Sequence, residues 1–122
     1  DLDFSQTVQY NLTQQLLKLS IALNHQVGRA LLVVMAEHRE AAGDFFKQYL
    51  LPRREQTRKL IQLAIARQEI CADYDFESML DMLYGAIHYQ IIFFNAVPDQ
   101  PYIEKIIQVA LAPMLLAEQG GA

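Results

Sequence analysis

FESMLDMLYGAIHYQIIFF, residues 76–94, is the stretch that decides the fold. At about 100° per residue, its apolar side chains cover about twice the stripe of roughly 100° that a helix needs to pack on one core. Asp81, Gly85 and His88 form its polar gap. Such a helix is either the central helix of a monomeric bundle, or it packs inside the protein on one side and on a partner on the other. The second interpretation is favoured.

A second apolar helix follows directly. Asp99 can cap this last helix, which tolerates Pro101 in its first turn and ends before Gly120. Val109 and Leu116 add apolar surface behind its main stripe, so two successive helices have the character that a four-helix interface between two copies requires. The main stripe consists of Ile103, Ile106, Ile107, Ala110 and Met114.

The chain before the decisive stretch also has helical periodicity. A first helix from about Val8 carries two apolar stripes and is capped by Asp3 or Ser5. A second covers residues 26–39, and a run over residues 40–68 is divided by Pro52 near Leu50, because proline lacks the N–H that a helix interior needs. The second helix is expected to turn Leu31, Leu32, Met35 and His38 inward.

These patterns predict the fold class. Asp75 is a good cap for the helix that starts at residue 76. No stretch of useful length alternates with period two, so no strand is expected. We therefore predict an all-α fold: a bundle of about five to six helices forming a single domain over residues 1–122, whose last two helices make a four-helix dimer interface with a second copy.

Composition narrows the function classes. The chain is 52% hydrophobic and 20% charged, as in globular proteins, and its longest uncharged stretch, from Met82 to Val97, falls short of the ~20 apolar residues of a membrane span. The single Cys71 indicates a reducing, cytoplasmic setting. A net charge of −4 is unfavourable for holding a phosphate backbone. The chain opens on Asp1 rather than Met, which suggests a truncation point.

Four segments carry a family resemblance. They are Pro52-Arg53-Arg54, the run AIARQEI at residues 64–70, Asp73-Tyr74-Asp75, and the run LYGAIHY at residues 83–89. Over about Gly28 to Ala112, the chain resembles the C-terminal regulatory domain of tetracycline-repressor-like (TetR family) transcription regulators. It departs from the family at two places: residues 67–69 read Arg-Gln-Glu where relatives often read Arg-Gly-Glu, and residues 88–90 read His-Tyr-Gln where they often read Tyr-Tyr-Arg.

The resemblance implies a cytoplasmic homodimeric repressor that dimerises through its last two helices and holds a small lipophilic inducer among the others. DNA binding would belong to an N-terminal helix-turn-helix domain that is absent from this sequence. The candidate seam on the decisive helix is Met82, Ala86, Tyr89 and Phe93, joined by the main stripe of the last helix. Two alternatives are a helical protein–protein interaction module without a ligand and, more distantly, a small-molecule enzyme built on a helical bundle.

Candidate sites are few. His88 is a candidate because a polar side chain in a mostly apolar pocket is the usual construction of a small-molecule site. The alternative is that His88 is a histidine at the edge of the core, hydrogen-bonded to a neighbouring helix. The candidate pocket residues, each of which can also be ordinary core, are Leu16, Met35, Phe45, Tyr49, Tyr84 and His88. The three histidines lack metal-ligand spacing, and no catalytic signature or cofactor motif is present. The basic residues from Arg53 to Arg67 are interpreted as a solvated face.

Overall fold

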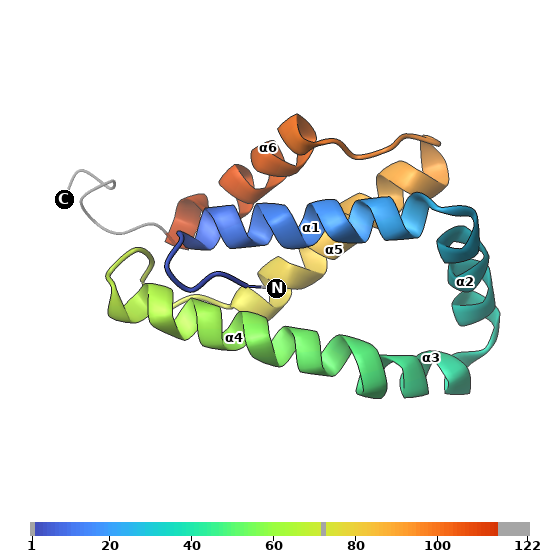
Figure 1. Ribbon diagram of the computed structural model, residues 1–122, viewed down its shortest axis with the longest axis horizontal. Helices are drawn as coiled ribbons and strands as arrows, with labels where there is room; N and C mark the ends of the chain where they lie inside the picture. Colours follow the sequence, from blue (N-terminus) through green and yellow to red (C-terminus); the bar gives the residue numbers. More distant parts are fainter. Residues whose placement is uncertain (1, 72, 115–122) are drawn as a thin grey trace.

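The computed structural model describes residues 2–71 and 73–114, and this part of the chain contains helices and no strand, as predicted (Figure 1). A π-helical segment joins two of the α-helices, and a 3-10 turn follows the last one. The elements are α1 (Val8–Asn24), α2 (Gln26–Glu37), α3 (Arg39–Phe45), the π-helical η1 (Phe46–Leu50), α4 (Leu51–Ala66), α5 (Phe76–Phe93), α6 (Gln100–Leu111) and the 3-10 turn η2 (Ala112–Met114). The predictions for Leu116 and for the end before Gly120 lie outside the described residues.

Side-chain caps explain where the helices start. Asp75 caps α5 and Asp99 caps α6, each by accepting a backbone N–H from within the first turn, as predicted. The predicted cap of α1 was wrong, because Thr7 accepts the N–H of Tyr10 instead. Asp3 is engaged one turn earlier, where its carboxylate accepts both the N–H and the hydroxyl of Ser5.

The helix boundaries around Pro52 also follow from local chemistry. Pro52 occupies the first turn of α4, so the long run divides between Leu50 and Leu51, as predicted. α2 ends at Glu37, two residues before its predicted end. His38 is exposed rather than turned inward. An exposed His38 marks the corner between α2 and α3.

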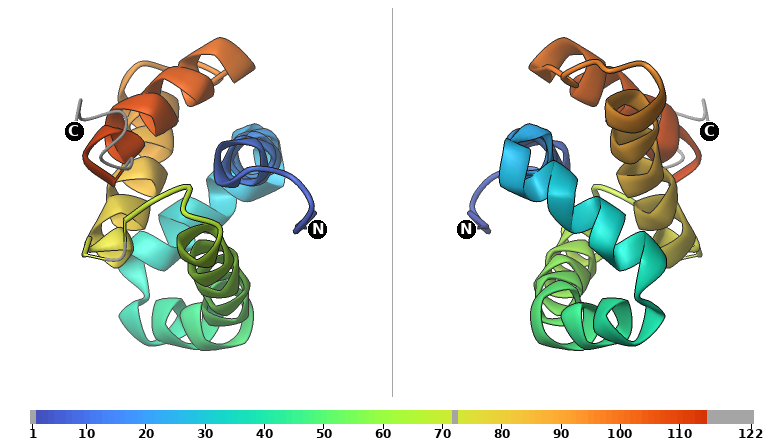
Figure 2. Two further views of the ribbon diagram at one scale, coloured as in Figure 1. Left: turned by 90° about the vertical axis from the view of Figure 1, so that its left-hand side faces the viewer. Right: turned by 90° about the vertical axis from the view of Figure 1, so that its right-hand side faces the viewer.

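Four helices enclose the core. α1 and α4 lie side by side and run in opposite directions, and the views along these helices place α5 and α6 together on one side of them (Figures 1 and 2). α1 packs on all three of the others. The largest fully buried side chains are Leu12, Leu16, Leu60, Ile61, Ile70, Met79, Leu80, Leu83, Ile87, Ile91, Ile103 and Ile107. Each such side chain contributes about 1.5–3 kcal/mol by its removal from water.

α2 and α3 form an arm at one end of this core, called here the α2–α3 arm (residues 26–45; Figure 1). α2 leaves α1 at 85°, and Gly28 makes the corner feasible, because a Cβ there would come within 2.0 Å of the carbonyl oxygen of Ala22. Within the described residues, the backbone of α2 packs only on α1 and α3, and that of α3 only on α2 and η1. Although α2 is rich in leucine and valine, neither helix of the arm contributes a fully buried residue.

In residues 2–71 and 73–114, no individual helix combines the length and hydropathy needed to cross a bilayer. The pair α1 and α2 reaches those values only when the two are joined across their bend.

Candidate functional site

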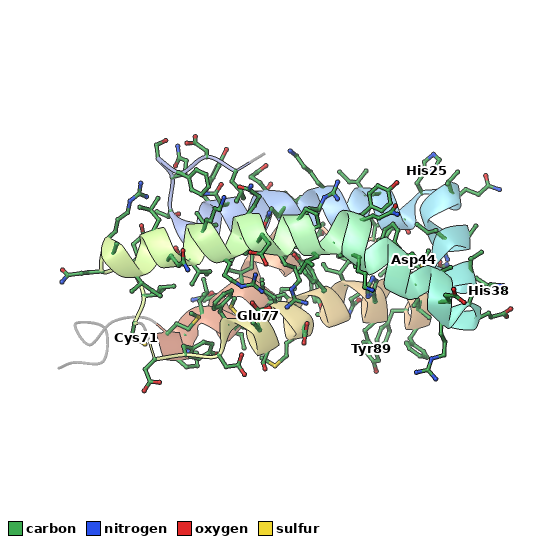
Figure 3. All side chains as sticks on the ribbon, turned by 90° about the horizontal axis from the view of Figure 1, so that it is seen from below. His25, His38, Asp44, Cys71, Glu77 and Tyr89 are labelled. Atoms are coloured by element: carbon green, nitrogen blue, oxygen red, sulfur yellow. The ribbon has the colours of Figure 1, made fainter. Side chains whose placement is uncertain are left out.

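The outer face of α5 is apolar and open to solvent. Met82 is 60% exposed, Tyr89 53% and Phe93 73%, while Ala86 between them is half-buried. In Figure 3, Tyr89 projects from α5 on the side away from α4. The ring of Tyr89 lies 5.2 Å from that of Phe93 and 5.3 Å from that of Phe94, so the aromatic side chains form a cluster. All four residues predicted for the seam on this helix therefore lie on one accessible or partly accessible face.

The predicted stripe of α6 is distributed differently. Ile103, Ile107, Ala110 and Met114 are buried inside the protomer, each at most 8% exposed, because this side of α6 packs on α1 and α5 of the same chain. A partner cannot reach them while the protomer keeps this packing. Ile106 is half-buried at the edge, and the exposed apolar position is Val109, at 71%.

A groove of about 440 Å³ runs between α5 and α6. Its walls are almost entirely apolar, and it opens beside the exposed face of α5. The residues that line it are Tyr74, Met82, Leu83, Lys105, Ile106, Val109, Ala110 and Pro113. The groove thus joins Met82 and Ile106, two of the predicted seam residues, into one surface with Val109.

A second groove, of about 290 Å³, lies between α1 and α6. Its rim is mostly amide and hydroxyl groups over a floor that includes Ile107 and Leu111. Neither groove is lined by any of the six predicted pocket residues.

Those six residues divide into three sets. Leu16 is 1% exposed and belongs to the core. Phe45 and Tyr49 stand together at the end of the arm with their rings 5.2 Å apart, and Met35 on α2 is half-buried. Tyr84 and His88 are half-buried one turn apart on α5.

Burial shifts the ionisation of both α5 residues. It raises the pKa of Tyr84 above its usual value, while the nearby Arg54 and Arg53 oppose that change. It lowers the pKa of His88, because the charged imidazolium is the less well solvated form. Tyr84 and a neutral His88 therefore present polar groups in a mostly apolar environment.

An arginine network between α4 and α5 was missed by the sequence reasoning. The basic residues of α4 were interpreted as a solvated face, and this was wrong for Arg54, whose side chain is 14% exposed. Its Nη1 lies 2.8 Å from Oδ1 of Asp81, and its Nη2 donates to the carbonyl of Glu77 at 2.9 Å. Arg58 donates to the carboxylate of the same Glu77 through Nε at 2.8 Å. In Figure 3, Glu77 lies between the two helices.

The signal for this network was present in the sequence. Arg54 and Arg58 are four residues apart, as are Glu77 and Asp81, so each pair shares one helical face. The spacing along one helix does not indicate which other helix lies beside it. The ion pairs between these two faces could therefore not be predicted without knowing that α4 and α5 are neighbours.

Residues 7–110 match the model of one protein family, described as tetracyclin repressor-like, C-terminal domain. The chain belongs to this family. The resemblance inferred from residues 28–112 is thereby confirmed, and the match extends over all of α1 as well. No curated protein matches the chain. The family is one of regulatory domains rather than enzymes.

One of the two departures from the family pattern, Gln68, lies at the end of α4. Gln68 has φ of 63°, in the left-handed region, and it follows the last turn of α4. Its N–H donates to the carbonyl of Ile65, and the N–H of Glu69 donates to that of Ala64, which together make a Schellman motif. The Gly that relatives often carry here suits this backbone, whereas Gln68 adopts it at a steric cost.

Proposed function

We propose that residues 1–122 form the effector-binding and homodimerisation domain of a TetR-like transcriptional repressor acting in the cytoplasm. In this proposal, a small lipophilic ligand changes the DNA affinity of an N-terminal helix-turn-helix domain outside this sequence. The observation that carries it is the exposed apolar face of α5, continuous with the groove toward α6. Such a contiguous apolar surface is typical of protein interfaces.

The residues of this face support a partner that is a second copy. Gly85 and Ala86 are small and lie midway between Met82 and Tyr89, so two α5 helices can approach closely there. In an antiparallel crossing about a two-fold axis between Gly85 and Ala86, Tyr89 of one copy comes opposite Met82 of the other. Each copy thus supplies an aromatic cluster that projects and a groove that receives it, as an isologous interface requires.

The α2–α3 arm supports a ligand site. Leu31, Met35 and Phe45 of the arm are half-buried, whereas Val27, Val33 and Val34 are exposed. No residue of α2 or α3 is fully buried. On α5, the polar side chains of Tyr84 and His88 are also half-buried. An apolar lining with a few polar groups is the usual composition of a small-molecule site.

Regulation follows from differential binding. The ligand can act only by binding one dimer geometry more tightly than another, since equal affinity for both shifts nothing. Among the residues that the structure describes, the backbone of the arm lies close only to α1 and η1, its neighbours in the chain. A ligand is therefore expected to change the position of the arm relative to the rest of the protomer.

Light scattering tests the central claim. The purified chain should scatter with about twice its 14.0 kDa mass at micromolar concentration. A monomer under these conditions would contradict the proposed dimer. A thermal-shift screen of lipophilic compounds tests the ligand site separately, and a dimer that no compound stabilises would favour an interaction module instead.

A further inference from the structure

The loop that joins α5 to α6, residues 94–99, is fastened at two points. Near its end, the hydroxyl of Ser20 on α1 donates to the carbonyl of Pro98 at 2.8 Å, and both residues are buried. Near its start, Nη2 of Arg29 on α2 donates to Oδ1 of Asn95 at 3.2 Å, and this bond is exposed. The loop is thus held to α1 by a buried bond and to α2 by an exposed one.

Arg29 joins three elements of the fold. It lies at the start of α2, and its Nη1 donates to Oδ1 of Asn24, the last residue of α1, at 3.3 Å. In residues 2–71 and 73–114, no other hydrogen bond or ion pair connects the α2–α3 arm to α5, to α6 or to the loop between them. The guanidinium of Arg29 is therefore the polar connection between the arm and this pair of helices.

Asn95 links that guanidinium to the aromatic cluster of α5. It follows Phe93 and Phe94 directly, and its φ of 50° lies in the left-handed region, which asparagine adopts more readily than most residues with a Cβ. The next N–H, that of Ala96, donates to the carbonyl of Gln90 at 3.1 Å and closes the turn. The position of Asn95 is thus tied to the end of α5, where two of the exposed aromatic side chains lie.

The two bonds of Arg29 are the easier ones to break. Their lengths of 3.2 and 3.3 Å are at the long end of the hydrogen-bond range, so a further separation of about 0.4 Å abolishes them. Exposed donors and acceptors then return to water, whereas breaking the Ser20 bond would leave buried groups without partners. A displacement of the arm therefore releases the start of the loop before its end.

We propose that Arg29 couples the α2–α3 arm to the outer face of α5, because its guanidinium joins the start of α2 to Asn95, next to the aromatic cluster. While the bonds are made, Phe93 and Phe94 are held in one position; when a ligand moves the arm, the bonds break and the end of α5 is released. This inference rests on the proposed function and names the residue through which its regulation passes. Coupling of this kind is reciprocal, so a fixed loop also steadies the arm.

Hydrogen exchange, followed by NMR on the whole chain, tests the coupling from both ends. Arg29→Met removes the donors and should speed exchange of the Ala96 N–H several-fold. Asn95→Gly removes the acceptor but suits the left-handed backbone, and it should speed exchange of the Arg29 N–H, which donates to the carbonyl of His25 in the first turn of α2. Arg39→Met, on α3, loses the same charge and should leave both rates unchanged.

The double variant separates a shared bond from two independent effects. If Arg29 and Asn95 act on each other, Arg29→Met should change neither exchange rate further in the Asn95→Gly background. Additive changes would overturn the proposal, and so would an Asn95→Gly variant whose α2 exchanges as the wild type does. Both substitutions are at exposed sites, so the fold should tolerate them.

Gly28→Ala displaces the arm without a ligand, because its Cβ would come within 2.0 Å of the carbonyl oxygen of Ala22 and the corner must shift. Sedimentation should show several-fold weaker dimerisation for Gly28→Ala, and no further weakening when Asn95→Gly is already present. Gly43→Ala, with open space at its Cβ, is the control. Equal weakening by Gly28→Ala in both backgrounds would overturn the role of Arg29. If the wild-type chain is a monomer, the proposed dimer fails, while the exchange rates still decide whether Arg29 couples arm and loop.

Discussion

The backbone N–H of Asp3 donates to Oδ1 of Asn11 at 2.7 Å, and Nδ2 of Asn11 donates back to the carbonyl of Asp3 at 2.8 Å. Asn11 is 2% exposed, and its Nδ2 also donates to the carbonyl of Thr7. One buried amide thus holds the segment before α1 against that helix. The same segment is held from outside, where Arg67 donates to the carbonyl of Phe4.

Asn11→Ala should therefore destabilise the fold. It leaves the part-buried N–H of Asp3 without its acceptor, while the carbonyl of Asp3 still accepts the N–H of Gln6. The free energy of unfolding should therefore fall by about 1–3 kcal/mol in urea denaturation. Asn24→Ala is the control, since the side chain of Asn24 accepts one exposed bond from Arg29 and its loss should cost less than about 0.5 kcal/mol. Equal losses of unfolding free energy in the two variants would show that the hydrogen bonds of Asn11 stabilise the fold no more than the exposed bond of Asn24 does.

Gln68→Gly should stabilise the protein. The left-handed backbone at Gln68 costs a residue with a Cβ about 1–2 kcal/mol, which glycine avoids, while glycine adds entropy to the unfolded chain. The net gain should be about 1 kcal/mol in the free energy of unfolding. Gln68→Ala keeps the Cβ and should show no such gain. A destabilised Gln68→Gly variant would mean that the side chain, rather than the backbone, determines this turn.

His88 should make stability depend on pH. Because burial lowers its pKa in the folded state below the usual 6.5, the unfolded chain takes up a proton at a pH where the folded one does not. The contribution of neutral His88 to the free energy of unfolding is complete above about pH 6.5, and it is lost as the pH falls through the lower pKa of the folded state. Urea denaturation between about pH 7 and pH 5 should show this decline, and His88→Gln should flatten it. His38→Gln, at an exposed site, should keep the wild-type slope.

The helices could be predicted because their signals are local. Asp75 and Asp99 stand immediately before apolar runs, and a carboxylate there caps the next turn whatever the rest of the chain does. The cap of α1 was mispredicted because three polar residues compete near its start, and Asp3 is already satisfied by Ser5. Thr7 then remains for the cap.

The partition of α6 could not be predicted in the same way. Its helical projection shows apolar residues on two sides, and nothing in one helix states which side meets the rest of its own chain. Packing on α1 and α5 buries the side with Ile103 and Ile107 and leaves Val109 outside. The network of Arg54 escaped prediction for the same reason, since it joins residues 27 positions apart.

Charge on the outer face of α5 should break the proposed dimer. In a symmetric interface, Ala86→Glu or Phe93→Glu would bury two unpaired carboxylates, one from each copy. The cost of about 3 kcal/mol or more should weaken association roughly 10²-fold. Light scattering should then give the mass of one chain. Ile21→Glu is the control, because Ile21 is 68% exposed on α1, close to the 73% of Phe93. A dimer that survives both α5 variants would place the seam on another face.

Gly85→Ala should separate the protomer from its assembly. Gly85 lies inside α5, and a Cβ there would meet nothing within 4 Å, so alanine should stabilise the isolated protomer by about 0.5–1 kcal/mol through helix propensity. At a close crossing of two α5 helices, the same methyl group pushes the axes apart and should weaken the dimer several-fold. Gly43→Ala in α3 has equally open space and should stabilise without affecting dimerisation. If Gly85→Ala instead strengthens the dimer or leaves it unchanged, the helices do not cross at this residue, because only a contact that close can sense one added methyl group.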